Sequence, residues 1–178
     1  MNQIIHDFYV QPMQQVYLEA AGMYLLWTIA MLLLRGKAKR FVARIGVLLA
    51  VALILVFTLW RRSKGEAAEL VLTPFVSFAK AQTQPEYYRT MFMNILLFLP
   101  LGLSLPHALS YRTRHKLLFT ALTGILLSVG VEAIQYFFRL GKCETDDVIM
   151  NTVGVLLGMT SYGICYLCHR IASKLKRI

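Results

Sequence analysis

Acidic side chains and cysteines are scarce in this chain, and each shortage excludes a class of protein. Asp and Glu number 9 against 19 Lys and Arg, and only 16% of the 178 residues are charged whereas 57% are hydrophobic. A soluble domain of this length would lack the polar surface needed to cover so large an apolar content. Three cysteines cannot all pair within one chain, which argues against a disulfide-stabilised secreted scaffold. The composition therefore predicts an integral membrane protein.

Long apolar segments make up most of the chain. A helix that crosses the hydrocarbon core of a bilayer needs about 20 predominantly apolar residues. Five segments approach that length: Val16–Leu34, Phe41–Trp60, Met91–Leu109, Leu117–Phe138 and Ile149–Leu167. The connections between them are short except for Arg61–Thr90, and the sequence contains neither an internal repeat nor a low-complexity tail. We therefore expect an all-α, polytopic membrane bundle of five helices, with residues 1–178 as one domain.

The placement of Lys and Arg predicts the orientation, because cytoplasmic connections are enriched in these residues. Twelve of them follow the first, third and fifth spans, and seven lie on the other side of the membrane. This bias predicts a multi-pass cell-membrane protein whose N-terminus is outside and whose C-terminus is cytoplasmic. Met1–Gln15 has no Lys or Arg before a first span of full length, so we do not expect a cleaved signal peptide. We attribute the formal charge of +10 to this orientation and not to nucleic-acid binding, so no nucleic-acid partner is expected.

The connection between the second and third spans contains a short apolar segment, Leu70–Phe78, which Pro74 interrupts. It is too short to span, so we expect a re-entrant or interfacial segment. Tyr87 and Tyr88, just downstream, are typical of the membrane–water boundary. A capping loop over the bundle is an equally good interpretation.

Helix-breaking and small residues in the third and fifth spans predict close helix packing. Pro100 removes a backbone donor, which predicts a kink at that residue, and we expect Pro100 and the nearby Gly102 to serve helix packing. Gly154 and Gly158 form a GxxxG pair that lets another backbone approach, and we expect this use within the monomer first and in a dimer second. Asn94, near the outer end of the third span, is expected to hydrogen-bond across helices or to contact a ligand.

Polar residues converge on the fourth span, the loop after it and the start of the fifth span. Glu132 lies within an apolar span, where an ionisable side chain is costly and is retained mainly if it faces the bundle interior or handles a polar substrate. Gln135 and Arg139 follow at helical spacing, which predicts that all three side chains share one face. The acids of the next loop and the polar start of the fifth span complete a candidate polar site: Glu144, Asp146, Asp147 and Asn151.

These residues, in this order, resemble the VanZ-like membrane family, which is named for an accessory glycopeptide-resistance protein of Gram-positive bacteria. The resemblance is carried by Pro74-Phe75, the run Asn94–Gly102, Glu132 with Gln135, and Arg139–Asp147 leading into Asn151, Gly154 and Gly158. Lys142 departs from the pattern, since relatives often have an arginine after the glycine and a lysine lacks the guanidinium fork. The resemblance implies an all-helical protein of the cell envelope and, for some members, reduced susceptibility to teicoplanin-type lipoglycopeptides. It implies no mechanism.

Two interpretations of the polar cluster remain open at this point. In the first, the cluster binds or acts on a polar envelope molecule, with Glu132 as a general base. In the second, the same residues form a structural clasp. The expected clasp pairs are Glu132 with Arg139 or Asn151, Gln135 with Asn94, and Asp147 with the N-terminus of the fifth helix. Alternatives to a resistance protein are a membrane enzyme acting on envelope lipid or polymer headgroups and a proton-relaying transport accessory; no GxSxG, HExxH or phosphate-binding glycine loop names a reaction.

No metal or other cofactor is expected. Glu144, Asp146 and Asp147 offer hard oxygen ligands, but they are fewer than a calcium shell needs, and Lys142 opposes a cation. Cys165–His169 matches the c-type haem attachment pattern, yet it ends a membrane helix on the predicted cytoplasmic side and has no evident second axial ligand. The expected partners are membrane lipids and a cell-envelope precursor or lipoglycopeptide.

Overall fold

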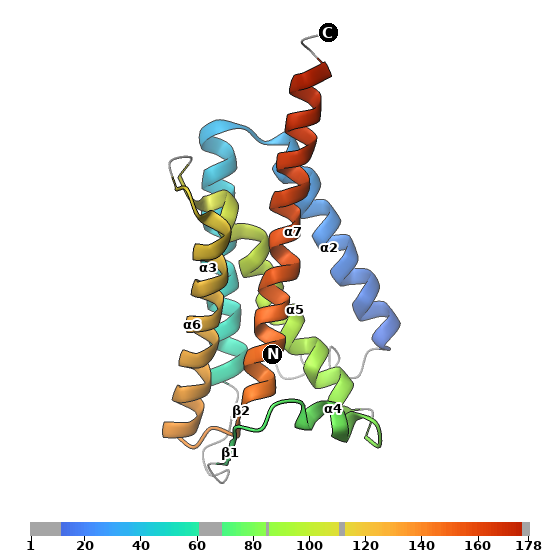
Figure 1. Ribbon diagram of the computed structural model, residues 1–178, viewed down its shortest axis with the longest axis vertical. Coiled ribbons are helices and arrows are strands. Elements are labelled where there is room, and N and C mark those ends of the chain that lie inside the picture. Colours follow the sequence, from blue (N-terminus) through green and yellow to red (C-terminus); the bar gives the residue numbers. More distant parts are fainter. Residues whose placement is uncertain (1–11, 61–68, 85, 111–112, 176–178) are drawn as a thin grey trace.

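Five long helices form a bundle whose long axis runs vertically in Figure 1. The computed structural model describes residues 12–60, 69–84, 86–110 and 113–175. The long helices are α2 (Met13–Leu33), α3 (Gly36–Leu55), α5 (Glu86–Ala108), α6 (Lys116–Phe137) and α7 (Thr145–Leu175). All five are long and apolar enough to cross a membrane, and this confirms the predicted all-α, polytopic architecture.

Shorter elements gather at the lower end of the bundle in Figure 1. Helix α3 continues into a five-residue π-helical segment, η1 (Val56–Trp60). The strand β1 (Leu70–Val71) and the six-residue helix α4 (Val76–Ala81) precede α5, and the strand β2 (Cys143–Glu144) precedes α7. The two strands pair in parallel. The segment expected to be re-entrant or interfacial is therefore a strand, a turn and a short helix at the end of the bundle.

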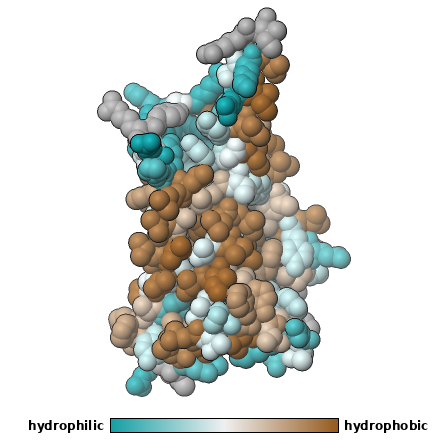
Figure 2. Space-filling view, viewed as in Figure 1, coloured by the Kyte–Doolittle hydropathy of each residue, from teal (hydrophilic) through white to brown (hydrophobic). Residues whose placement is uncertain are grey.

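The outer surface of the bundle is apolar along its middle and polar at both ends, as Figure 2 shows. Large hydrophobic side chains such as Leu26, Leu48 and Leu126 remain exposed on α2, α3 and α6. Exposed leucines are costly in water but suit contact with lipid chains. Helix α5 differs, because 67% of its most apolar window is buried, against 17–39% for the other four helices. It is the central helix, and Phe98 and Leu101 on it pack in the main apolar core with Ile54 and Val155.

Glycines allow α5 and α7 to approach each other at backbone distance. A Cβ atom added at Gly154 would collide with the Ile95 carbonyl, and one added at Gly102 would collide with the Val155 carbonyl. A Cβ atom at Gly158 would lie 2.6 Å from the Leu103 amide nitrogen. The GxxxG pair of α7 thus packs against α5 of the same chain, and Pro100 lies inside α5 without ending it.

Adding a methyl group at Gly158 is expected to destabilise the bundle. Because the new Cβ would meet backbone atoms that cannot rotate away, Gly158→Ala should cost about 1–3 kcal/mol through overpacking. Gly163→Ala on the same helix is the matched control, since nothing lies within 4 Å of a Cβ there. The melting temperatures of both variants are measured on the purified protein in detergent, with the loss of the monodisperse species on heating as the readout. Equal melting temperatures for the two variants would contradict the packing described above.

Candidate functional site

Two chain segments that are far apart in sequence are joined at the lower end of the bundle. The register pairs Leu70 with Cys143 and Val71 with Glu144. The Cys143 N–H also donates to the Glu69 carbonyl over 2.9 Å, and the Lys142 ammonium forms an ion pair with the Glu69 carboxylate on the surface. Their hydrogen bond lowers the pKa of Glu69 and raises the pKa of Lys142. The loop after α6 is thereby held against the segment that precedes α4.

Asp146, in the first turn of α7, holds the start of α4. One of its carboxylate oxygens accepts a hydrogen bond from the Phe75 N–H over 2.5 Å, and the other accepts one from the Ser77 N–H over 2.7 Å. Phe75 has a left-handed backbone (φ 66°) and immediately precedes the first residue of α4. Asp146 therefore does for α4 what an N-capping side chain does for its own helix. Beside it, Ser77 Oγ donates to the Glu144 carboxylate over 3.2 Å.

Asp147 and Asn94 connect α7 to α5 at the same end. Asn94 Nδ2 donates to the Asp147 carboxylate over 2.7 Å. Asn94 thus hydrogen-bonds across helices, but its partner is Asp147, and the expected pair with Gln135 is not the one that forms. The reason is geometric, because Asn94 lies on the part of α5 that faces α7, whereas Gln135 donates to the carbonyl of Thr58 in η1.

A buried polar layer lies where α6 meets α7 and η1, and it consists of Ser128, Glu132, Gln135 and Asn151. The three α6 residues are four and three positions apart, so they share one face of that helix. The Glu132 carboxylate is only 4% exposed and accepts a hydrogen bond from the Glu144 N–H over 3.2 Å. Glu132 is therefore turned into the protein, toward β2, and not toward lipid chains.

Two amide oxygens of the buried polar layer have no hydrogen-bond partner within the described parts of the chain. Gln135 is 1% exposed, and its Oε1 accepts nothing although its Nε2 donates to Thr58 over 3.0 Å. Asn151 is 3% exposed, and its Oδ1 accepts nothing although its Nδ2 donates to Ser128 Oγ over 2.9 Å. A buried acceptor without a donor costs about 1–3 kcal/mol. Two such oxygens beside a buried carboxylate make this layer suited to a ligand that donates hydrogen bonds.

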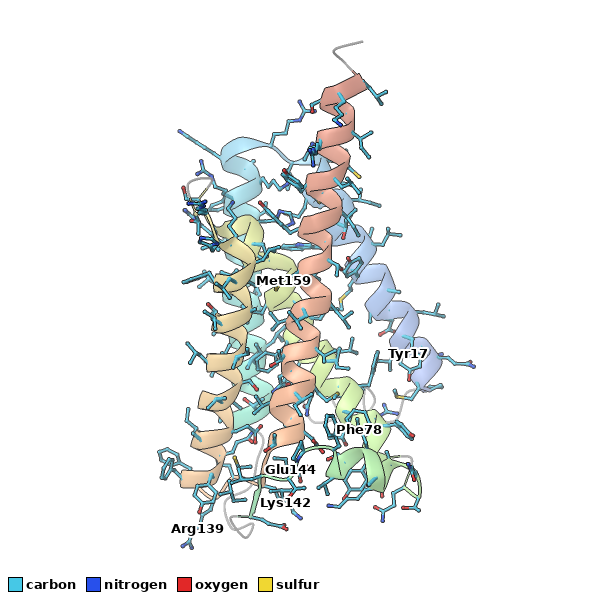
Figure 3. All side chains as sticks on the ribbon, viewed as in Figure 1. Tyr17, Phe78, Arg139, Lys142, Glu144 and Met159 are labelled. Atoms are coloured by element: carbon cyan, nitrogen blue, oxygen red, sulfur yellow. The ribbon has the colours of Figure 1, made fainter. Side chains whose placement is uncertain are left out.

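Arg139 does not belong to the buried polar layer. Helix α6 ends at Phe137, and Arg139 has a left-handed backbone (φ 54°) and an exposed side chain. Figure 3 shows it at the lower tip of the molecule, next to the loop that carries Lys142. The prediction that Arg139 shares a face with Glu132 and Gln135 is wrong, because residues spaced three, four or seven apart share a face only while the helix continues, and α6 ends before Arg139.

Sequence analysis missed three partners of the site: Thr58, Ser77 and Ser128. Ser128 precedes Glu132 by four residues, so helical spacing could have placed it on the same face as Glu132. Thr58 contributes a backbone carbonyl in the last turn of the α3–η1 helix, where carbonyls lack an intrahelical donor. Ser77 contributes its backbone N–H as well as its hydroxyl. Backbone groups leave no trace in residue type, so the Thr58 carbonyl and the Ser77 N–H had no signal in the sequence.

The acids at this end hold protein groups instead of gathering around one point. In the segments that the structure describes, no group of three or more His, Cys, Asp and Glu is arranged to hold a metal ion. Asp146 accepts from the start of α4, Asp147 accepts from Asn94, and Glu144 accepts from Ser77. The three cysteines are unpaired, with Cys143 half-buried, Cys165 buried against α2 and Cys168 exposed.

Comparison with known proteins gives one family and one relative. The family model described as VanZ/LLP1 matches residues 41–167, a range that contains every residue of the polar cluster. Protein VanZ from Enterococcus faecium is 34% identical over 109 residues, which are 61% of this chain and 61% of that protein. The match thus spans less than two-thirds of the relative's length. No solved structure matches the chain.

The thiol of Cys143 is expected to report on the neighbouring carboxylates. Burial, together with the charges of Glu132 and Asp147, raises the pKa of Cys143, and only the thiolate reacts with alkylating reagents. Glu132→Gln should lower the pKa of Cys143. At a pH below that pKa, more of the thiol is then ionised and it is alkylated faster. The measurement is the rate of maleimide labelling against pH in a variant that lacks Cys165 and Cys168. Glu86→Gln, at an exposed position in the first turn of α5, is the control, and an unchanged rate in Glu132→Gln would refute the electrostatic coupling.

Asp146→Asn is expected to lower the stability of the fold. An asparagine can accept one of the two backbone hydrogen bonds through Oδ1, but it turns an NH₂ group toward the other donor. The unsatisfied N–H at the start of α4 should cost about 1–3 kcal/mol. Thermal melting in detergent and limited proteolysis between α4 and β1 measure the effect, again beside Glu86→Gln. Wild-type melting of Asp146→Asn would show that the anchor contributes nothing to stability.

Proposed function

The chain belongs to the VanZ/LLP1 family, and from that premise we propose that it lowers the susceptibility of the cell to teicoplanin-type lipoglycopeptides, using the buried polar layer as its binding site. Five helices that can span a membrane support a multi-pass protein of the cell envelope. The similarity to Protein VanZ supports the same assignment. The route from binding to resistance is interception of the antibiotic at the membrane.

The observation that carries the proposal is the set of acceptor atoms in the buried polar layer. The Oε1 atom of Gln135 and the Oδ1 atom of Asn151 lack donors, and they lie in the same layer as the Glu132 carboxylate. Such a layer favours a ligand with peptide N–H groups, sugar hydroxyls or an ammonium group. A lipoglycopeptide supplies peptide and sugar donors on a molecule whose acyl chain enters the bilayer. The chemistry of the ligand and that of the layer are therefore complementary.

The depth of the layer suits a ligand that lies at the membrane surface. Glu132 and Gln135 are within two turns of Phe137, the last residue of α6, and Asn151 is in the second turn of α7. Two helical turns correspond to about 11 Å, so the layer is close to the membrane boundary. Under the predicted orientation this end faces outward, which is the side from which the antibiotic arrives.

The test is teicoplanin susceptibility of a host that expresses the wild type or single-site variants. Glu132→Gln is expected to return the minimal inhibitory concentration to that of the host without the protein, because the carboxylate is the only charged acceptor of the layer. Its abundance in the membrane, measured by immunoblotting, should match the wild type. Glu86→Gln removes an exposed acid at the same end and is expected to keep full resistance.

Two results would count against the proposal. Full resistance in Glu132→Gln would show that resistance does not depend on the buried polar layer. A loss of resistance that only follows a loss of abundance would assign Glu132 to the structural clasp. Binding of labelled teicoplanin to the purified protein in lipid nanodiscs provides the direct measurement, with Glu132→Gln and Glu86→Gln as the pair of variants.

A further inference from the structure

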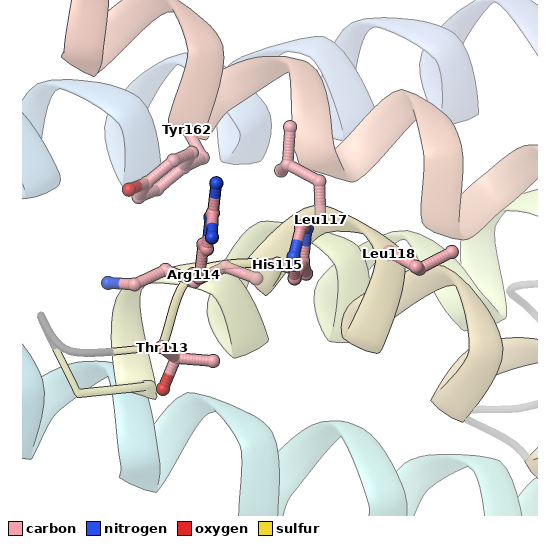
Figure 4. A pocket seen from close by; sticks show the side chains of 7 residues that line it. Thr113, Arg114, His115, Leu117, Leu118 and Tyr162 are labelled. Atoms are coloured by element: carbon pink, nitrogen blue, oxygen red, sulfur yellow. The ribbon is translucent and has the colours of Figure 1, made fainter.

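The end of the bundle opposite the buried polar layer carries a pocket of about 520 Å³. Its walls come from the connection before α6, the first turns of α6 and the face of α7 that carries Tyr162. Figure 4 shows Tyr162 on one side and Thr113, Arg114 and His115 on the other. Three consecutive lining residues, Arg114, His115 and Lys116, are basic.

Further positive charges lie near Lys116 on a second helix. Lys39 and Arg40, in the first turns of α3, are close enough to Lys116 to repel its ammonium group. Lys116 itself donates to the Leu109 carbonyl over 3.3 Å and lies 5.6 Å from the centre of the Tyr162 ring. Both contacts orient the ammonium group, and neither the carbonyl nor the ring is an acid. The charge density at this end is therefore high and of one sign.

Asp and Glu are missing from the sequence segments around these cations. The segments 20–65, 87–131 and 148–178 contain no Asp or Glu at all. They include the α2–α3 connection, the end of α5, the start of α6 and the C-terminal half of α7, which lie at the upper end in Figure 1. The segments around Arg114 and Lys116 thus carry cations with no Asp or Glu among them, a composition that favours an anionic ligand.

The start of α6 adds uncapped backbone donors to the pocket. His115 precedes the helix and makes no side-chain capping hydrogen bond, and the first turn contains no acidic residue. The first N–H groups of a helix lack intrahelical partners, and the helix dipole favours an anion there. The 22-residue helix α6 thus presents its positive end to a pocket that is already basic.

A buried histidine behind the pocket points to the same kind of ligand. His107 is 4% exposed, and neither of its ring nitrogens has a hydrogen-bond partner in the described structure. Its ring packs against Tyr162 at 5.1 Å between centroids, and the charges of Lys39 and Lys116 act on it. An anionic oxygen that passes Tyr162 would give the imidazole N–H an acceptor.

From these observations we propose that the pocket binds the phosphate headgroup of an anionic glycerophospholipid. The phosphate oxygens would accept from Arg114, Lys116 and the first N–H groups of α6. An acyl chain then has a path along α6, because Leu118, Leu122 and Leu126 are exposed and stand four residues apart on one face. Basic pockets between membrane helices are suited to anionic headgroups. This inference does not depend on the proposed function, since the two sites lie at opposite ends of the bundle.

The experiment measures lipid binding to the purified full-length protein in a non-ionic detergent. Short-chain phosphatidylglycerol is the probe, and phosphatidylcholine with the same acyl chains tests the need for net negative charge. Arg114→Gln combined with Lys116→Gln should weaken phosphatidylglycerol binding by roughly thirtyfold, as expected for the loss of two cations at the headgroup. Arg170→Gln combined with Lys174→Gln removes the same charge from exposed positions at the end of α7 and should leave binding close to wild type.

Three outcomes would overturn the proposal. Phosphatidylcholine would bind as tightly as phosphatidylglycerol if the net charge of the lipid played no part. The two double variants would lose affinity for phosphatidylglycerol equally if the lipid responded only to the total positive charge of this end and not to the pocket. Inorganic phosphate would bind as tightly as the lipid if the leucine path contributed nothing. Arg114→Gln alone, at an exposed position, should still weaken lipid binding by about fivefold, so the test stands even if the double variant does not fold.

Discussion

The close approach of α5 and α7 is the contact on which the rest of the structure depends. The two helices run in the same direction in Figure 1, and glycines on both sides let their backbones touch. Asn94 precedes Gly102 by eight residues, and Asp147 precedes Val155 by eight residues. The register that sets Gly102 against Val155 therefore also brings Asn94 within hydrogen-bond distance of Asp147. Packing of small residues in the middle of the membrane thus fixes polar contacts at its edge.

The irregular structure at the acidic end follows from the need to satisfy polar groups that water does not reach. Buried acids there accept hydrogen bonds from backbone N–H groups that no regular element uses. Asp146 takes those at the start of α4, and Glu132 takes that of Glu144 at the edge of the strand pair. The short strands and the left-handed turn at Phe75 are the backbone geometry that delivers these donors. Within the buried polar layer, two amide oxygens are left without a donor among the described residues, and this is why that layer is the binding site we favour.

The sequence predicts the spans well because a helix is stable in lipid when it is long and apolar enough, and both features can be seen in the sequence. It also predicts that Glu132 and Gln135 lie together, since α6 continues through both residues. It fails at Arg139, because no residue type between Phe137 and Gly141 marks the point where a left-handed residue ends the helix. It fails again at the β1–β2 pair, which is built from backbone hydrogen bonds between segments about seventy positions apart. Partners that act through their backbone, such as Thr58, leave no pattern to read.

The two ends of the bundle have opposite chemical needs, and this asymmetry links the two proposed sites. One end holds buried acceptors that need donors, and the other holds cations for which the neighbouring segments provide no acid. Anionic phospholipids are enriched in the cytoplasmic leaflet, where each Lys or Arg near the surface gains about 1 kcal/mol. Occupation of the basic pocket would therefore hold that end on the cytoplasmic side. The acceptor layer would then be held at the outer surface, so the charge distribution from which the orientation is predicted would also present the polar layer to ligands that come from outside.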